Sequence, residues 1–95
     1  MGLTRLIESA EVFGFEWRRD LFVPMFQFDL PDLTVRPESR RVLAELLPAL
    51  DPWSLAVWFG QPNSSLHGQR PLDLLDSDLP AVLEVARMDR YVERG

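Results

Sequence analysis

The spacing of apolar residues changes near residue 11, and this change separates a predicted helix from a predicted hairpin. Within 1–10 the apolar residues recur at helical intervals, which predicts a short N-terminal helix. Over 12–18 every second position is aromatic, as is typical of a half-buried strand. A second run over 21–29 is predicted to pair with the first as an antiparallel hairpin, with Pro24 at an edge or a bulge because proline cannot donate to the ladder.

Two helices separated by a proline are predicted after a linker over 30–36. Pro37 suits the first position of a helix, and the apolar stripe that follows it reaches Pro48, so this helix should end over 45–47. Asp51 provides an N-cap for the next helix, and Gly60 lies just past its predicted end. That second helix is apolar on nearly all sides, which predicts burial on more than one face.

The last third of the chain completes a small mixed fold. We expect a polar loop over 61–69, a short helix over 71–75 and a final helix from Ser77 or Asp78 to about Tyr91. The elements together indicate an α+β fold, in which a short N-terminal antiparallel β-hairpin packs on a small bundle of about four helices. A chain of 95 residues has room for one such domain. Within it, 1–36 form the N-terminal helix, hairpin and linker, and 37–95 form the helical region.

Composition and charge narrow the function classes. The chain has ten arginines, no lysine and fifteen acidic residues, for a net charge of −5, which argues against nucleic-acid binding. It has no cysteine, and no apolar run approaches the roughly 20 residues that a membrane-spanning helix needs. No signal peptide is apparent at its start. We therefore expect a cytoplasmic protein with no membrane segment.

The candidate catalytic and metal-binding residues do not form a known site. His67 has no second histidine or cysteine as a co-ligand. Ser64 and Ser65 lack the glycine-rich elbow and the oriented base of a nucleophile site. The acidic residues over 73–78 lack the spacing of a calcium loop. We therefore predict a non-enzymatic protein without catalytic residues, cofactor or metal.

The aromatic residues of the N-terminal segment allow two interpretations. Such a set can stack the bases of a single-stranded nucleic acid, but stacking surfaces of that kind lie in a basic groove. Here Arg18 and Arg19 are offset by neighbouring acidic residues. The charge balance favours core packing, or a dimer or partner surface, for Phe13, Phe15, Trp17, Phe22, Phe26 and Phe28.

The segment from Trp53 to Ala86 resembles the toxin-binding domain of the Xre/MbcA/ParS group of bacterial antitoxins. That pattern has a helix with tryptophan, a turn of the form Pro-Asn…Leu-x-Gly-x-x-Pro-Leu-x-Leu-Leu, and a closing helix. The run Pro24–Asp29 is also similar to a Pro-x-Phe-Gln-Phe-Asp strand that precedes the domain in many such sequences. The matching residues, each with a structural role of its own, are Trp53, Trp58, Asn63, Leu66, Gly68, Pro71, Leu72 and Leu75.

The resemblance implies an antitoxin that binds and neutralises a toxin, usually a RES-domain toxin that consumes NAD. The polar residues His67, Gln69 and Arg70 lie between the motif positions and are candidates for toxin contact. By position near the terminus, Arg90, Tyr91, Arg94 and the carboxylate of Gly95 are candidates to shield the toxin's active site. Most members carry an N-terminal helix-turn-helix, for which this chain has no room, so direct operator binding is not expected. The alternative is a dimerisation or interaction module of a larger regulatory protein, with the aromatic hairpin as a possible homodimer surface.

Overall fold

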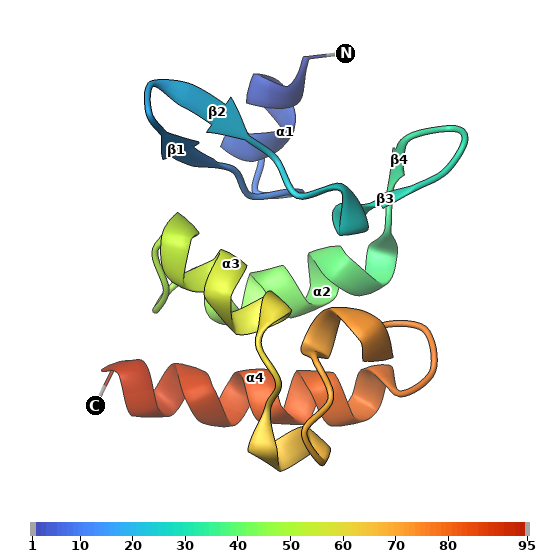
Figure 1. Ribbon diagram of the computed structural model, residues 1–95, viewed down its shortest axis with the longest axis vertical. Coiled ribbons are helices and arrows are strands. Elements are labelled where there is room, and N and C mark those ends of the chain that lie inside the picture. The colour runs from blue at the N-terminus through green and yellow to red at the C-terminus, as the bar shows by residue number, and fades with distance from the viewer. Residues whose placement is uncertain (1, 95) are drawn as a thin grey trace.

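The computed structural model describes residues 2–94 (Figure 1). Within these residues the chain forms four helices and two short antiparallel strand pairs. The predicted α+β class is confirmed. The helices are α1 (Leu3–Glu8), α2 (Pro37–Leu46), α3 (Pro52–Gly60) and α4 (Leu79–Arg94). The strands are β1 (Phe15–Trp17), β2 (Asp20–Phe22), β3 (Phe28–Asp29) and β4 (Thr34–Val35). Three 3-10 turns complete the set: η1 (Met25–Gln27), η2 (Ser64–Leu66) and η3 (Pro71–Leu74).

The predicted hairpin forms, but its second strand is much shorter than expected. Strands β1 and β2 pair with Phe15 opposite Phe22 and Trp17 opposite Asp20. Arg18 and Arg19 form the turn, with φ values of 52° and 71°, which is the left-handed pair that a two-residue hairpin turn requires. The prediction of one strand over 21–29 is wrong: β2 ends at Phe22, and the chain bends at Pro24 into η1.

A second strand pair occupies the region predicted as a linker. Strands β3 and β4 pair with Phe28 opposite Val35 and Asp29 opposite Thr34. The expectation that 30–36 is only a linker is therefore wrong at Thr34 and Val35, where the chain turns back onto the end of the 21–29 run.

The proline and capping residues in the sequence predicted most of the helix ends to within one or a few residues. Helix α2 ends at Leu46, inside the predicted range and ahead of Pro48. Asp51 caps α3 as predicted, because its Oδ1 accepts a hydrogen bond from the Ser54 amide at 2.8 Å. Gly60 is the last residue of α3 rather than the residue past it. The short helix predicted over 71–75 is the 3-10 turn η3, and α4 continues past Tyr91 to Arg94.

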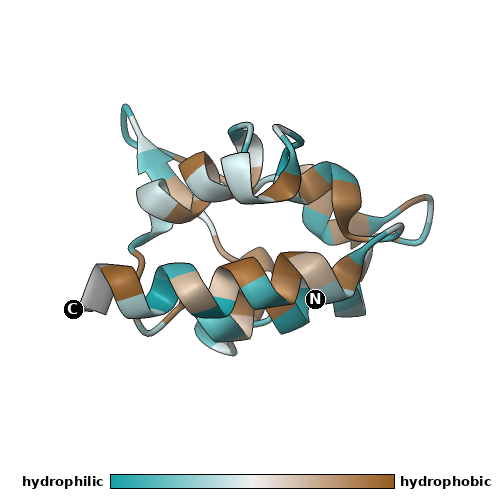
Figure 2. Ribbon diagram, turned by 90° about the horizontal axis from the view of Figure 1, so that it is seen from below, coloured by the Kyte–Doolittle hydropathy of each residue, from teal (hydrophilic) through white to brown (hydrophobic). Residues whose placement is uncertain are grey.

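The main core lies between the helical layers. Figure 1 shows α1 and the β1–β2 hairpin in one layer, α2 and α3 below them, and α4 below these, with the turn η2 on the outer side of α4. Polar residues separate the apolar residues along α4 (Figure 2), and α4 packs against α2. At helical spacing such apolar residues form one side of the helix. No helix within residues 2–94 has both the length and the hydropathy that crossing a bilayer requires. The fully buried core side chains include Val42, Leu43, Leu46, Leu55, Phe59, Leu75, Val82 and Ala86.

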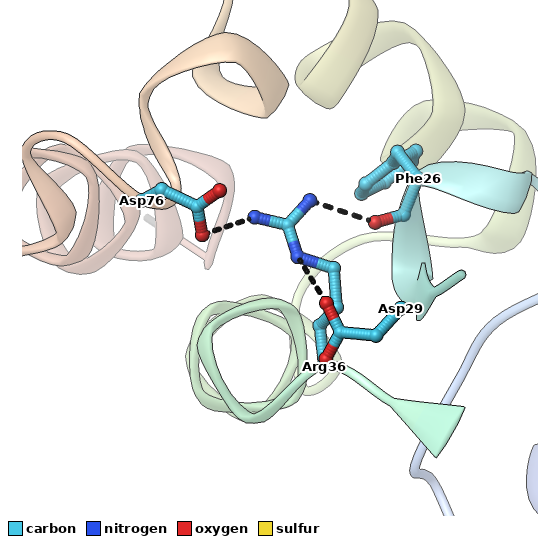
Figure 3. Close-up of polar contacts among 4 residues, drawn as sticks. All are labelled: Phe26, Asp29, Arg36 and Asp76. Atoms are coloured by element: carbon cyan, nitrogen blue, oxygen red, sulfur yellow. Dashed lines mark hydrogen bonds and ion pairs between the residues drawn. The ribbon is translucent and has the colours of Figure 1, made fainter. Parts of the chain in front are cut away.

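Arg36 joins the nearby segment from Phe26 to Asp29 to Asp76, which lies forty residues further along the chain (Figure 3). Its side chain is only 14% exposed. Its Nη1 donates to the Phe26 carbonyl at 3.1 Å, and its Nη2 donates to Asp76 Oδ1 at 2.7 Å. Asp29 Oδ1 lies 3.9 Å from its Nε. The N-terminal segment is thereby tied to the connection between η3 and α4.

Candidate functional site

The predicted polar loop is a closed turn held by backbone hydrogen bonds. The Asn63 amide donates to the Gln69 carbonyl at 3.0 Å, and the Gly68 amide donates to the Asn63 carbonyl at 2.9 Å. The side chain of Asn63 accepts from the Ser65 amide at 2.9 Å, which starts η2. These bonds close the loop over 63–70, and buried Leu66 anchors it to the core.

Two left-handed residues direct the loop's polar side chains outward. His67 has φ +58° and Gly68 has φ +80°. A Cβ on Gly68 would meet no atom within 4 Å, so the backbone angle, rather than lack of space, favours glycine there. Leu66 before this pair and Pro71 after it are buried, whereas His67, Gln69 and Arg70 are exposed. The loop therefore presents three polar side chains between two buried anchors.

Arg70 is held in place by an acidic neighbour. Its Nε donates to Asp73 Oδ2 at 2.7 Å and its Nη2 donates to Asp73 Oδ1 at 3.1 Å. These hydrogen bonds, and then the charge of Asp73, raise the pKa of the Arg70 guanidinium. Arg70 is therefore a fixed cation at the edge of the loop, with further N–H groups not used by Asp73.

The predicted contact residues near the C-terminus differ in whether their side chains are exposed or paired with other side chains. Tyr91 is 72% exposed. Arg90 Nη1 lies 3.3 Å from Glu45 Oε2, and its guanidinium is 5.6 Å from the centre of the Tyr91 ring. Arg90 therefore joins α4 to α2 instead of pointing wholly into solvent. The side chain of Arg94 and all of Gly95 lie outside the described part of the chain.

The two predicted contact sets occupy different places. Figure 1 shows the 63–70 loop folding beside the middle of α4, with η2 in contact with the helix. Arg90 and Tyr91 lie toward the C-terminal end of the same helix. The structure thus places both sets along α4 without bringing them into one cluster.

Most motif residues that the sequence assigned to the scaffold are buried or half-buried. Leu66, Pro71 and Leu75 are buried, and Leu72 packs against the core. Trp58 is half-buried, and its Nε1 donates to Asp89 Oδ2 at 2.7 Å. Trp53 differs, because it is 52% exposed.

Trp53 belongs to an aromatic surface that it forms with the hairpin. Its ring stacks on Trp17 at 5.6 Å and meets Phe15 edge-on at 5.3 Å. Phe15 in turn stacks on Phe22 at 5.8 Å. We call Phe15, Trp17, Phe22 and Trp53 the aromatic surface; they line a hollow of about 230 Å³.

The aromatic set predicted from the sequence is therefore divided between two roles. Phe13 and Phe26 pack on Phe59 in the core, with ring centres 5.8 and 4.8 Å from its centre. Phe28 is buried in a smaller cluster with Leu6 and Val12. Sequence reasoning did not group Trp53 with the hairpin. The available signal was its place in the first turn of a helix that is apolar on all sides.

The chain was compared with models of protein families, with curated proteins and with solved structures. None of the three comparisons found a match.

Proposed function

We propose that this chain is a protein-binding domain of the antitoxin kind, which binds and neutralises a toxin. The resemblance of the segment from Trp53 to Ala86 points to a RES-type toxin that consumes NAD. The observation that carries the proposal is the 63–70 loop, whose exposed His67, Gln69 and Arg70 stand between buried Leu66 and Pro71.

The geometry of this loop is suited to contact with a protein. Binding residues are often carried by loops that a rigid scaffold positions, and internal hydrogen bonds limit the entropy lost when such a loop binds. Arg70 presents a planar guanidinium, which pairs well with carboxylates or phosphates. A partner lying along α4 would meet this loop first and Tyr91 near the end of the helix.

The proposed partner also indicates where the complex acts. A toxin that consumes NAD finds its substrate in the cytoplasm, so we propose that the chain binds its toxin there. The chain contributes no catalytic group in this proposal; it acts by covering the partner.

Co-expression with the product of the neighbouring gene tests the proposal. We expect that product alone to arrest growth and lower cellular NAD, and the chain to restore both and to co-purify with it. The variant Gln69→Ala/Arg70→Ala should lose the rescue while it retains its melting temperature. A matched control, Gln61→Ala/Arg41→Ala, removes the same two residue types elsewhere on the surface and should rescue normally. A harmless neighbouring product, or the absence of a complex, would refute the proposal.

A further inference from the structure

We propose that the aromatic surface is a second docking site, which binds a partner-protein segment in which an apolar side chain is followed directly by arginine or lysine. The inference goes beyond the toxin proposal, because it concerns the hairpin and α3 rather than the 63–70 loop.

The first part of this site is the hollow lined by Phe15, Trp17, Phe22 and Trp53. Three of these rings are about half exposed: Trp17 by 50%, Phe22 by 44% and Trp53 by 52%. Aromatic side chains that cluster at the surface are a common anchor site in protein interfaces. With only aromatic side chains as its lining, the hollow favours an apolar side chain of a partner.

The second part is an adjoining hollow of about 450 Å³ that shares Phe15 and Trp53 as its wall. Two acidic residues, Glu16 and Asp51, are among the residues that line it, and none of its lining residues in the described part of the chain is an arginine. Asp51 is ionised at neutral pH, since its ordinary pKa is 3.8 and the hydrogen bonds it accepts at the start of α3 lower that pKa further. A cation next to the apolar anchor would thus be attracted to this second hollow.

The arginines of the hairpin tip, Arg18 and Arg19, are not among the residues that line the two hollows. Arg18 places its guanidinium 5.7 Å from the centre of the Trp17 ring, so this surface already holds a cation against an aromatic face. The net charge of −5 on the whole chain also favours a basic partner.

Area and charge favour a short segment over a second copy of this chain. With about 150–250 Å² for a whole aromatic side chain, three half-exposed rings offer roughly 300 Å². A stable protein interface buries about 800 Å² on each side. Two copies joined through this surface would also bring Glu16 and Asp51 close to the same carboxylates of the other copy. A short basic and apolar segment meets neither difficulty.

Selection from a display library of short random peptides tests the chemistry of the occupant. We expect the enriched peptides to carry a leucine, methionine or aromatic residue followed by arginine or lysine. A synthetic peptide of the enriched sequence should bind Trp53→Ser about tenfold more weakly than the native chain. It should bind Glu16→Gln about threefold more weakly.

Matched controls separate this site from the rest of the surface. Tyr91→Ser removes an exposed aromatic ring elsewhere, and Glu84→Gln removes an exposed carboxylate elsewhere; neither should change peptide binding. In an NMR titration, the indole N–H signals of Trp17 and Trp53 should shift, while that of Trp58, which is bonded to Asp89, should stay in place. If Trp53→Ser fails to fold, Trp17→Ser and Glu16→Arg take its place.

Three results would overturn the proposal. Enriched peptides could be acidic or purely polar, or binding could be unaffected by the substitutions at Trp53 and Glu16. Sedimentation could also reveal a dimer that Trp53→Ser abolishes, which would assign the surface to a second copy. The Gln69→Ala/Arg70→Ala variant should bind the peptide normally. If the peptide experiments fail, the toxin proposal therefore still stands, and if the toxin proposal fails, the peptide site still stands.

Discussion

Gln27 acts as a substitute for a strand at the point where the chain leaves the hairpin. Its Oε1 accepts from the Phe13 amide at 2.9 Å, and its Nε2 donates to the carbonyls of Phe13 and Pro24, each at 3.0 Å. The residue is completely buried. In the β1–β2 register a longer second strand would put Pro24 opposite Phe13, and proline has no N–H to give the Phe13 carbonyl. The side-chain amide of Gln27 satisfies both backbone groups of Phe13 instead.

Replacing Gln27 should therefore lower the free energy of unfolding by more than the size of its side chain suggests. Gln27→Met keeps the length of the side chain but leaves the buried N–H and C=O of Phe13 without partners. We expect the free energy of unfolding to fall by about 2–4 kcal/mol, measured by urea denaturation. Gln61→Met, at an exposed position, is the control. A loss smaller than about 0.5 kcal/mol at Gln27 would show that Phe13 finds other partners.

Phe59 is the aromatic residue on which the core depends most. It is completely buried, and its ring lies 5.1 Å from that of Trp58 in addition to its contacts with Phe13 and Phe26. Phe59→Ala should lower the free energy of unfolding by about 3–5 kcal/mol. The same truncation at Trp53, which is half exposed, should cost clearly less. Equal losses in thermal melts of the two variants would contradict this ranking.

At the scale of the elements, the start of α3 depends on the charge of Asp51. The hydrogen bond from the Ser54 amide is the main cause that lowers the pKa of Asp51 below its ordinary value of 3.8. Because the pKa is lower in the folded state, the ionised cap stabilises the fold above pH 3.8, and this contribution is lost as the pH falls through the folded-state value.

Two variants separate the charge of this cap from its hydrogen bond. Asp51→Ala should melt a few degrees below the native chain at neutral pH, and the gap should close as the pH falls below about 3.8. Asp51→Asn retains a capping oxygen without the titration, so its difference from Asp51→Ala should not depend on pH in this range. The measurement is the melting temperature as a function of pH. A gap between the native chain and Asp51→Ala that is constant with pH would show that the charge of Asp51 adds nothing to its capping hydrogen bond.

The elements also show how far sequence reasoning extends. Pro37, Pro48 and Asp51 act within a few residues of where they stand, so the ends of α2 and the start of α3 were predictable. Strand β2 ends early because its register would bring Pro24, which has no N–H, opposite Phe13. Gln27 takes the place of the missing strand by bonding to Phe13, fourteen residues away, and a periodic pattern carries no information about such a contact. The exposure of Trp53 likewise depends on how the hairpin lies over α3. The loop residues His67, Gln69 and Arg70 were predictable as exposed, because the motif around them fixes a tight polar turn.

At the scale of the whole molecule, Arg36 is the main polar connection between the N-terminal strands and the helical region. Arg36→Met keeps much of the apolar packing but leaves the Phe26 carbonyl and Asp76 without the guanidinium. We expect a loss of about 1–3 kcal/mol in the free energy of unfolding. Asp76→Asn should cost less than about 1 kcal/mol, because Asp76 is largely exposed. Urea denaturation of both variants checks this order, and a reversed order would assign the connection to Asp76.

The turn of the β1–β2 hairpin has a consequence for the dynamics of the molecule. Arg18 and Arg19 adopt left-handed angles that cost about 1–2 kcal/mol for each residue other than glycine. A two-stranded hairpin is at best marginally stable alone, so the packing of Phe15 and Trp17 on Trp53 helps to hold it in place. We expect the amides of β1 and β2 to exchange with deuterium by local opening, well before those of α2 and α4. The double variant Arg18→Asn/Arg19→Gly should slow that exchange, because Asn and Gly adopt left-handed angles more easily than arginine does. Since Trp17 belongs to the hairpin, the opening of the hairpin sets how often the rings of Trp17 and Trp53 separate.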